Sequence, residues 1–307
     1  MSSWRRFAAL SMMLSIAACS DDSGNLGGGS AQGGAGQGGL GPGGEGPGAA
    51  APGGGSAEGG GGNQTGGASS VALPPANAQL DYQLGGAYTP PDGVVVLSRD
   101  RSAAPEPGLY NICYVNGYQA QEEEAAFWLE QRPDLVLRDA GGDPVIDEDW
   151  NEMLLDISTR EKRTALAQIV GGWVAQCKAD GFDAAEIDNL DSYARSQGLL
   201  IEDDAVAFMQ LLSAVAHENG LAIAQKNSTE LVPRREEMGT DFAVAEECNR
   251  YAECGEYRDG YGDLVFVIEY RQQDFDAGCA EHSDLSIVLR DLNLVDPSAG
   301  AYVYDDC

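Results

Sequence analysis

Histidine, lysine and arginine are scarce in this chain of 307 residues. It has two histidines, His217 and His282, and no cysteines in Cys-x-x-Cys spacing. Zinc sites are built mainly from such ligands, so a zinc-dependent enzyme is disfavoured. Lys and Arg number 18 against 49 Asp and Glu, a formal net charge of −31. This charge excludes nucleic acid as a partner, because phosphates need Lys and Arg, and argues against electrostatic docking on anionic lipid. A cationic ligand and a merely solvated acidic surface both fit it.

Long hydrophobic runs are also missing. The apolar stretch 7–18 is too short to span a bilayer as a helix. Arg5 and Arg6 precede it, which is the pattern of a secretory signal peptide. Residues 14–19 (LSIAAC) resemble the bacterial lipobox, so we predict a signal peptide over 1–19 and lipid attachment at Cys19. An ordinary signal with an incidental cysteine is the alternative. Ser20 favours export to the outer membrane over the inner one, with the domain facing the periplasm or the cell exterior.

Large apolar residues are nearly absent from 20–70, a Gly-rich segment. The first 70 residues hold 23 of the 41 glycines. Such a segment cannot bury enough surface to offset its ordering entropy, so we expect a disordered tether. Residues 71–307 then form one domain with 45 acidic and 16 basic side chains. Its length suits a single α/β barrel.

Six cysteines remain once Cys19 is set aside, and they all lie in the predicted domain. An even number in an exported protein favours disulfides. Cys248 and Cys254 are close enough to bridge locally, and Cys279 with Cys307 would fix the C-terminus. Six cysteines allow fifteen pairings, and the sequence does not choose among them.

Short apolar or β-branched runs alternate with segments of helical period. We predict strands at 94–97, 111–115, 153–157, 184–188, 221–225, 242–246, 265–269 and 285–289, and helices that include 163–179 and 204–219. Nearly continuous apolar strands suit a buried parallel sheet, and eight βα units predict a closed (β/α)8 TIM-type barrel. An open doubly wound sheet is the alternative, but no Gly-x-Gly-x-x-Gly follows the first strand.

Polar side chains stand at the ends of seven predicted strands, where barrel enzymes place their chemistry. A glycosidase needs two carboxyl groups from different strand ends. Asp188 and Glu246 meet this need, with Asp156, Glu186 and Glu269 as rivals. Glu186 lies two residues before Asp188 on the same face and is read as a supporting residue bonded to a basic side chain. Residues 186–191 superficially resemble a calcium loop but lack its Gly and distal Glu, so calcium is not favoured.

The motifs around these residues resemble glycoside hydrolase family 114, the endo-α-1,4-polygalactosaminidase group. Residues 181–193 (GFDAAEIDNLDSY) match its Gly-Phe-Asp-x-x-Glu-x-Asp-Asn-x-Asp-x-Tyr signature. Residues 221–227 are similar to its Gly-Leu-Lys-Asn strand, 241–254 to its Asn-Glu-Gln-Cys and Tyr-x-Glu-Cys motifs, and 265–270 to its Val-Glu-Tyr strand. The resemblance covers nearly all of 80–307 in the same order.

The resemblance implies a barrel that hydrolyses α-1,4-linked galactosamine chains. It places the nucleophile at Asp188 and the general acid at Glu246. We expect no cofactor and no metal in this site. Further sugar-binding or pKa-tuning candidates at the strand ends are Tyr114, Asn116, Asp156, Glu186, Asn189, Tyr193, Lys226, Asn227, Glu269, Tyr270 and Arg290; Tyr118 and Trp150 are additional aromatic candidates. The stretch 112–119 and Ala245 depart from the family pattern, which leaves the substrate open.

The sequence therefore predicts a surface-tethered, monomeric endo-glycosidase whose partner is a cationic or amino-sugar polysaccharide. Two alternatives stand beside it. One is a lipoprotein that binds polysaccharide without cutting it, because a fold does not dictate function. The other is a glycosidase of the same fold that acts on a different α-linked glycan.

Overall fold

The computed structural model describes residues 71–307, which belong to one compact unit. The predicted signal peptide, Cys19 and the linker over 20–70 lie outside the described residues. Within 71–307, every helix is too short or too polar to cross a bilayer.

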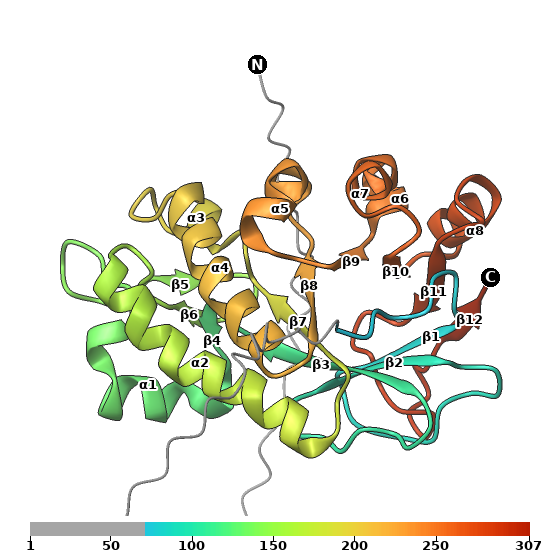
Figure 1. The fold of residues 1–307 in the computed structure, drawn as a ribbon, viewed down its shortest axis with the longest axis horizontal. Helices are drawn as coiled ribbons and strands as arrows, with labels where there is room; N and C mark the ends of the chain where they lie inside the picture. The colour runs from blue at the N-terminus through green and yellow to red at the C-terminus, as the bar shows by residue number, and fades with distance from the viewer. Residues whose placement is uncertain (1–70) are drawn as a thin grey trace, which may run out of the picture. The chain divides into compact units, whose positions relative to one another are not determined.

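Eight parallel strands form a nearly closed barrel, and a ninth runs antiparallel at its edge (Figure 1). In spatial order they are β1 (Leu80–Gln83), β2 (Val96–Asp100), β3 (Tyr110–Asn116), β7 (Ala184–Asp188), β8 (Ala222–Lys226), β9 (Phe242–Glu246), β10 (Val265–Glu269), β11 (Ser286–Arg290) and the antiparallel β12 (Tyr304–Asp306). β1 and β11 contact each other, and Arg290 of β11 donates to the backbone oxygen of Tyr82 in β1. The predicted barrel fold is confirmed.

The strands are buried on both faces, as their apolar composition predicts. Because side chains alternate along a strand, each strand feeds two cores. Alternate residues such as Ala184, Ala224 and Phe266 fill the barrel interior. The residues between them, such as Ala185 and Ile223, pack outward against the helices. This parity decides which side chains reach the inside of the barrel.

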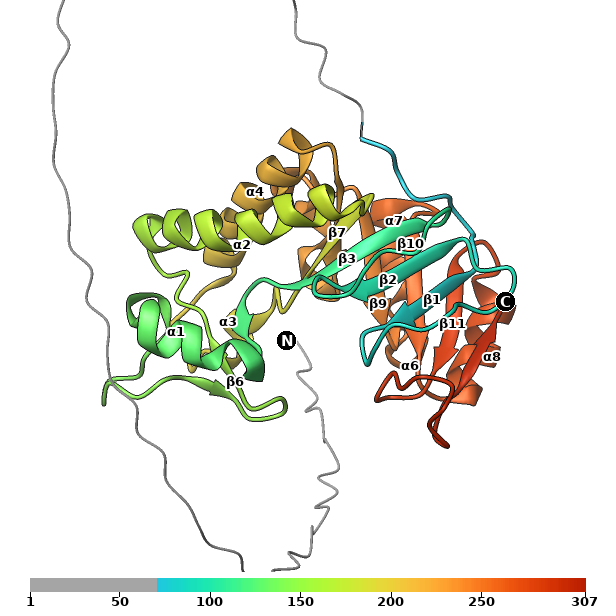
Figure 2. The ribbon, with the colours of Figure 1, turned by 90° about the horizontal axis from the view of Figure 1, so that it is seen from below.

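Helices cover the outside of β3 and of β7 to β11. Two long helices, α2 (Arg160–Asp180) and α4 (Glu202–Glu218), pack side by side (Figures 1 and 2). The hydroxyl of Thr159 caps the start of α2, and Gly181 ends it with a φ of 104°, a conformation that favours glycine. The shorter helices are α3 (Ser192–Arg195), α5 (Arg235–Met238), α6 (Cys248–Tyr251), α7 (Cys254–Tyr261) and α8 (Gln272–Glu281).

Two predicted details are wrong. The run 153–157 does not form a barrel strand: β6 (Glu152–Leu154) pairs antiparallel with β4 (Gln119–Ala120) and β5 (Ile146–Asp147) in a separate three-stranded sheet, which α1 (Ala125–Gln131) accompanies. The eighth barrel strand is instead β1, whose alternating polar residues hide it from a search for apolar runs. Loops, not helices, join β1 to β2 and β2 to β3 (Figure 2).

Three disulfides cross-link the domain. Cys113 of β3 is bonded to Cys177 of α2, Cys248 to Cys254, and Cys279 to Cys307. The prediction that the six cysteines form disulfides is confirmed, and both pairs suggested by proximity are present. The first pair joins a barrel strand to its covering helix, a contact that spacing along the chain does not reveal.

Candidate active site

Four neighbouring strands direct polar side chains into one end of the barrel. Side chains alternate along a strand, so Tyr114 of β3, Lys226 of β8 and Glu246 of β9 share the interior face with the apolar residues two positions before them. Asp188 of β7 shares that face with Glu186 and Ala184, two and four positions before it. Each stands at or near the carboxyl end of its strand, the end that carries the chemistry of barrel enzymes. Side chains far apart in the sequence therefore meet.

Lys226 is the centre of this group. Its Nζ lies 3.3 Å from Glu186 Oε1, 3.5 Å from Asp188 Oδ2 and 3.3 Å from Glu246 Oε2. It also donates to Tyr82 Oη at 3.0 Å, and the side chain is only 1% exposed. Burial by itself would lower the pKa of Lys226, but the three carboxylates raise it well above its usual value. Lys226 is therefore a permanent cation between the two predicted catalytic carboxylates.

Asp188 is held as a carboxylate. Tyr114 Oη donates to its Oδ2 at 2.7 Å, and the backbone N–H of Asn189 donates to its Oδ1 at 2.8 Å. Burial would raise the pKa of Asp188, but Lys226, Tyr114 and the Asn189 N–H hold it below its usual value. The side chain is 19% exposed, so an ionised oxygen remains accessible from the open end of the barrel.

Glu246 lies on the other side of Lys226 and is more accessible, at 28%. Tyr270 Oη donates to its Oε1, and Asn227 Nδ2 donates to its Oε2 at 3.1 Å. The backbone N–H of Glu246 in turn donates to Asn227 Oδ1 at 2.8 Å. Asn227 thus fixes both the main chain and the side chain of Glu246, which orients the carboxyl group.

The interior below the pair is closed by Glu186. It is fully buried and accepts hydrogen bonds from Tyr82 Oη at 2.6 Å and Ser98 Oγ at 2.9 Å. Burial raises the pKa of Glu186, against the lowering effects of Lys226 and Tyr82. Its contacts are those of the supporting residue expected from the sequence, with Lys226 as the basic partner. Tyr82 was missed because β1 was missed, and Ser98 was missed because it lies within β2 and not at its carboxyl end.

The backbone is strained directly after these side chains. Asn189, Asn227 and Glu247 follow Asp188, Lys226 and Glu246, and their φ angles are 66°, 49° and 56°. Asn adopts this left-handed conformation at small cost, but for Glu it is unusual. Strain of this kind clusters at functional sites because the surrounding structure must enforce it. In this domain the left-handed conformation follows three neighbouring strands, β7, β8 and β9.

A second group of polar residues extends the site toward the three-stranded sheet. Asn116 of β3 accepts from Asn189 Nδ2 at 3.0 Å and donates to Glu152 Oε2 at 2.8 Å. Arg195 of α3 donates to Asn189 Oδ1 at 3.1 Å. The pKa of Glu152 is raised to about 7, mainly by burial and also by the Asp188 carboxylate, against the lowering effect of the bond from Asn116. Glu152 was not predicted as a site residue, because the run 153–157 was expected to be a barrel strand and Glu152 precedes that run.

Two predicted site residues are engaged elsewhere. Asp156 pairs with Lys162 and accepts from Ser158 Oγ at 2.5 Å, all within the segment before and at the start of α2. Tyr193 of α3 donates to Glu230. Neither has a hydrogen bond or ion pair with Asp188 or Glu246 among the described residues. The placement of Asp156 differs from the prediction because β6 is not a barrel strand.

Arg290 and Glu269 have no hydrogen bond or ion pair with Asp188 or Glu246 among the described residues. Arg290 is fully buried and donates to Asp81 Oδ1 at 2.8 Å and to three backbone oxygens, so it joins β11 to β1. Glu269 follows Ile268, which faces the interior, and therefore turns outward. It accepts from the N–H of Asn249 at 2.8 Å. The sequence located these strand ends but not the face that each side chain occupies.

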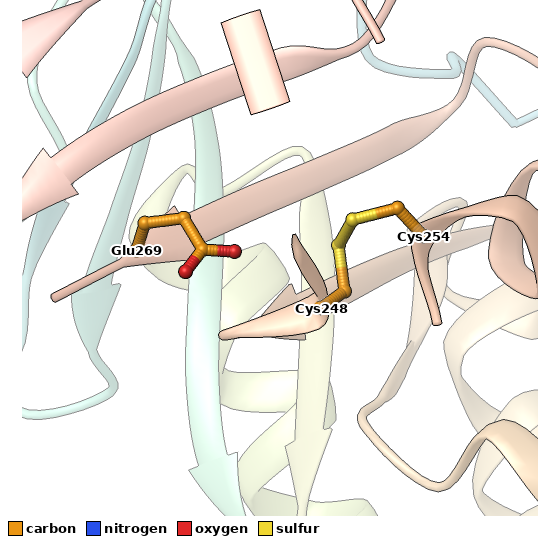
Figure 3. A group of neighbouring side chains, drawn as sticks. All are labelled: Cys248, Cys254 and Glu269. Atoms are coloured by element: carbon orange, nitrogen blue, oxygen red, sulfur yellow. A yellow bond between two sulfur atoms is a disulfide. The ribbon is translucent and has the colours of Figure 1, made fainter. Parts of the chain in front are cut away.

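Glu269 lies beside a disulfide (Figure 3). Among the described residues, Glu269, Cys248 and Cys254 are the one group of three or more His, Cys, Asp or Glu side chains whose possible ligand atoms all lie within 4.8 Å of one another. The two sulfurs are bonded to each other, so they are not thiolates and the group offers a single anionic ligand. In the run 186–191, Glu186 is fully buried and Asp191 pairs with Arg195.

Comparison with known proteins places the chain in a family. A sequence model of the glycoside-hydrolase family GH114 matches residues 61–307. The Ega3 protein of Aspergillus fumigatus, solved in complex with galactosamine, is similar in structure, with a TM-score of 0.63 and 22% identity over 78% of this chain and 98% of that one. The glycoside hydrolase domain of PelA from Pseudomonas aeruginosa has a TM-score of 0.50 and 14% identity over 73% of this chain and 97% of that one.

No curated protein matches the sequence. The two structures share the fold of the described domain, and the family model covers most of the chain, including every strand of the barrel. The predicted glycoside hydrolase is confirmed: the chain belongs to glycoside hydrolase family GH114.

Proposed function

We propose that this glycoside hydrolase cuts within α-1,4-linked galactosamine-type polysaccharide, with Asp188 as nucleophile and Glu246 as general acid. The observation that carries the proposal is the position of Lys226, which lies 3.5 Å from one carboxylate and 3.3 Å from the other. Lys226 contacts two accessible carboxyl groups that come from different strand ends. Glycoside hydrolysis requires such a pair of carboxyl groups. The galactosamine bound to the Ega3 protein supports the class of substrate.

The surroundings of the two carboxyl groups suit different roles. Asp188 has a lowered pKa, so it is ionised and able to attack or stabilise the developing oxocarbenium centre. Glu246 is the more exposed of the two and is oriented by Asn227 and Tyr270, so it is the group placed to protonate the leaving oxygen. Lys226 stabilises the negative charge that both residues carry at different steps.

The shared contact with Lys226 limits the separation of the carboxyl groups. Their facing oxygens, Asp188 Oδ2 and Glu246 Oε2, lie no more than about 7 Å apart, because each is within 3.5 Å of Nζ. Retaining enzymes hold the groups about 5 Å apart, and inverting enzymes use roughly 6.5 to 9.5 Å. We therefore propose retention of the anomeric configuration, which NMR of the first products tests.

Substitution of each carboxylate tests the function. Asp188→Asn and Glu246→Gln are expected to lower release of oligosaccharides from a galactosamine polymer by at least about a thousandfold. Glu148→Gln removes an exposed carboxylate from another loop and serves as the matched control. Release at the native rate by either active-site variant would exclude the assignment. Retention of the polymer by the native protein without any cleavage would favour the non-catalytic alternative.

The choice among α-linked glycans depends on residues that depart from the family pattern. Ala245 is one of them, and it packs into the outer core with Val267, away from the barrel interior. It therefore does not line the site, contrary to expectation. Tyr114 does line it, through its bond to Asp188. A panel of purified polymers decides between galactosamine chains and another α-linked glycan.

We also propose that the domain is tethered through Cys19 to the outer membrane and acts as a monomer. The lipobox-like sequence and the Gly-rich segment after it support this proposal. A Cys19→Ser variant is expected to leave the membrane fraction and to lose labelling by a fatty-acid analogue. Light scattering of residues 71–307 measures the mass of the domain in solution.

A further inference from the structure

The hairpin formed by β5 and β6 carries an exposed tryptophan beside the active site. Ile146 and Asp147 of β5 pair with Met153 and Glu152 of β6, so Trp150 lies in the connecting turn. Its side chain is 68% exposed. Glu152 is bonded to Asn116 at the end of β3, and two residues of extended chain span only about 7 Å. Trp150 is therefore close to the open end of the barrel.

The turn is held in place from both sides. Asp147 is 2% exposed, accepts from Gln119 Nε2 at 3.1 Å and lies 2.7 Å from Arg195 Nε. Its other oxygen accepts from the N–H of Asp149 at 3.0 Å, which shapes the turn. The backbone that carries Trp150 is thus restrained, because the turn is bonded at its base.

A fixed and exposed indole is suited to a sugar ring. Tryptophan combines a large apolar face with little conformational entropy to lose on binding, and isolated exposure of it brings no stability to the fold. Glu152, which is half-buried and two residues further along the chain, adds a carboxyl group already oriented by Asn116. An indole face and a directed carboxyl together recognise a sugar that carries a protonated amine.

We propose that Trp150 and Glu152 form an accessory subsite that binds an amino-sugar unit of the polymer beyond the bond cut at Asp188 and Glu246. This inference rests on the proposed function for the identity of the polymer. Trp150 stacks on the sugar ring and Glu152 pairs with its ammonium group. The subsite increases the affinity for long chains and takes no part in bond cleavage.

The test uses the full-length protein and galactosamine oligosaccharides of increasing length. Trp150→Ala is expected to raise KM for the polymer about tenfold and to change kcat less than twofold. Short oligosaccharides that fill only the sites next to the cut bond are expected to give native kcat/KM. Trp150→Phe keeps an aromatic face and is expected to restore most of the affinity. Glu152→Gln is expected to weaken binding of the galactosamine polymer but not of its N-acetylated form.

Control variants separate the subsite from general effects. Val95→Ala removes an exposed apolar side chain that directly precedes the amino end of β2, away from the active site. Glu148→Gln removes an exposed carboxylate from the turn that carries Trp150. Both variants are expected to behave as the native protein. A Trp150→Ala variant with native KM at every length, or with an equal loss at every length, would overturn the proposal.

Retention of the polymer in a gel gives a readout that does not depend on cleavage. If the native protein retains the polymer without cutting it, and Trp150→Ala releases it, the subsite stands while the proposed hydrolysis fails. If the native protein cuts the polymer and Trp150→Ala retains the polymer as strongly as the native protein does, the proposed subsite is wrong and the proposed hydrolysis stands. Absence of both retention and cleavage by the native protein overturns both.

Discussion

Replacement of Glu269 by glutamine is expected to stabilise the domain at alkaline pH. Glu269 is fully buried, and one of its oxygens, Oε2, has no hydrogen-bond partner in the described part of the chain. Burial raises its pKa from 4.5 to about 7. Between these two pH values the folded protein keeps a proton that the unfolded chain has released, so stability falls as the pH rises through this window. Above pH 7 the full cost is present.

Glutamine remains neutral and keeps the oxygen that accepts from Asn249. The variant is therefore expected to gain nothing below about pH 4.5 and up to about 3 kcal/mol above pH 7, since one pKa unit corresponds to about 1.4 kcal/mol. For a domain of this size the gain corresponds to roughly 6 to 12 °C in Tm. Urea unfolding at pH 5 and pH 8 measures it. Glu148→Gln, an exposed counterpart, is expected to change neither value by more than about 0.5 kcal/mol.

Two results would refute this reasoning. An equal gain at pH 5 and pH 8 would mean that ionisation of Glu269 is not the cause. A loss at pH 8 would mean that its carboxylate is stabilised by a partner that glutamine cannot replace. Because Glu269 turns away from the barrel interior, the variant is also expected to cleave substrate at the native rate, which separates it from the active-site group.

Three further predictions concern the active site and its support. Lys226→Met leaves buried carboxylates without a cation, so it is expected to lower kcat by about a thousandfold and to destabilise the fold by about 3 to 5 kcal/mol. A loss of activity under tenfold would contradict this role of Lys226. Tyr114→Phe removes a donor to Asp188, so the pKa of Asp188 rises and the acidic limb of the pH–rate profile is expected to move to higher pH; an unchanged profile would show that the bond does not tune Asp188. Replacing Cys248 and Cys254 with serine is expected to cost about 2 to 3 kcal/mol in urea unfolding and to raise the amide exchange of α6, since the short loop limits the entropic gain; native exchange rates there would argue against a restraining role.

The sequence predicted seven of the barrel strands and the two catalytic candidates because both leave local signals. Buried parallel strands are continuous apolar runs, and Asp188 and Glu246 stand where such runs end. β1 left no such signal. Its Asp81 and Gln83 are polar residues that are satisfied by Arg290 and Arg99, partners more than a dozen residues away. Long-range pairing of this kind cannot be read from the strand itself.

The face of each strand end was harder to predict than its position. Glu269 and Glu246 both end apolar strands, yet one faces outward and the other inward, because their strands differ by one residue in register: Ile268 pairs with Glu246. A shift of one residue moves a side chain to the opposite face. Glu152 was missed because the apolar run after it resembles a barrel strand but belongs to β6, the central strand of the separate three-stranded sheet. The site therefore depends on register, which propensity does not encode.

The roles of Asp188 and Glu246 are tested most directly with an oligogalactosaminide that carries an aryl leaving group. Such a leaving group departs without protonation, so a general acid is needed for the polymer but not for release of the phenol. The predicted result is that Glu246→Gln loses cleavage of the polymer and still releases a burst of phenol, whereas Asp188→Asn loses both. Release of phenol at the native rate by Asp188→Asn, or loss of the burst in Glu246→Gln alone, would contradict the assignment.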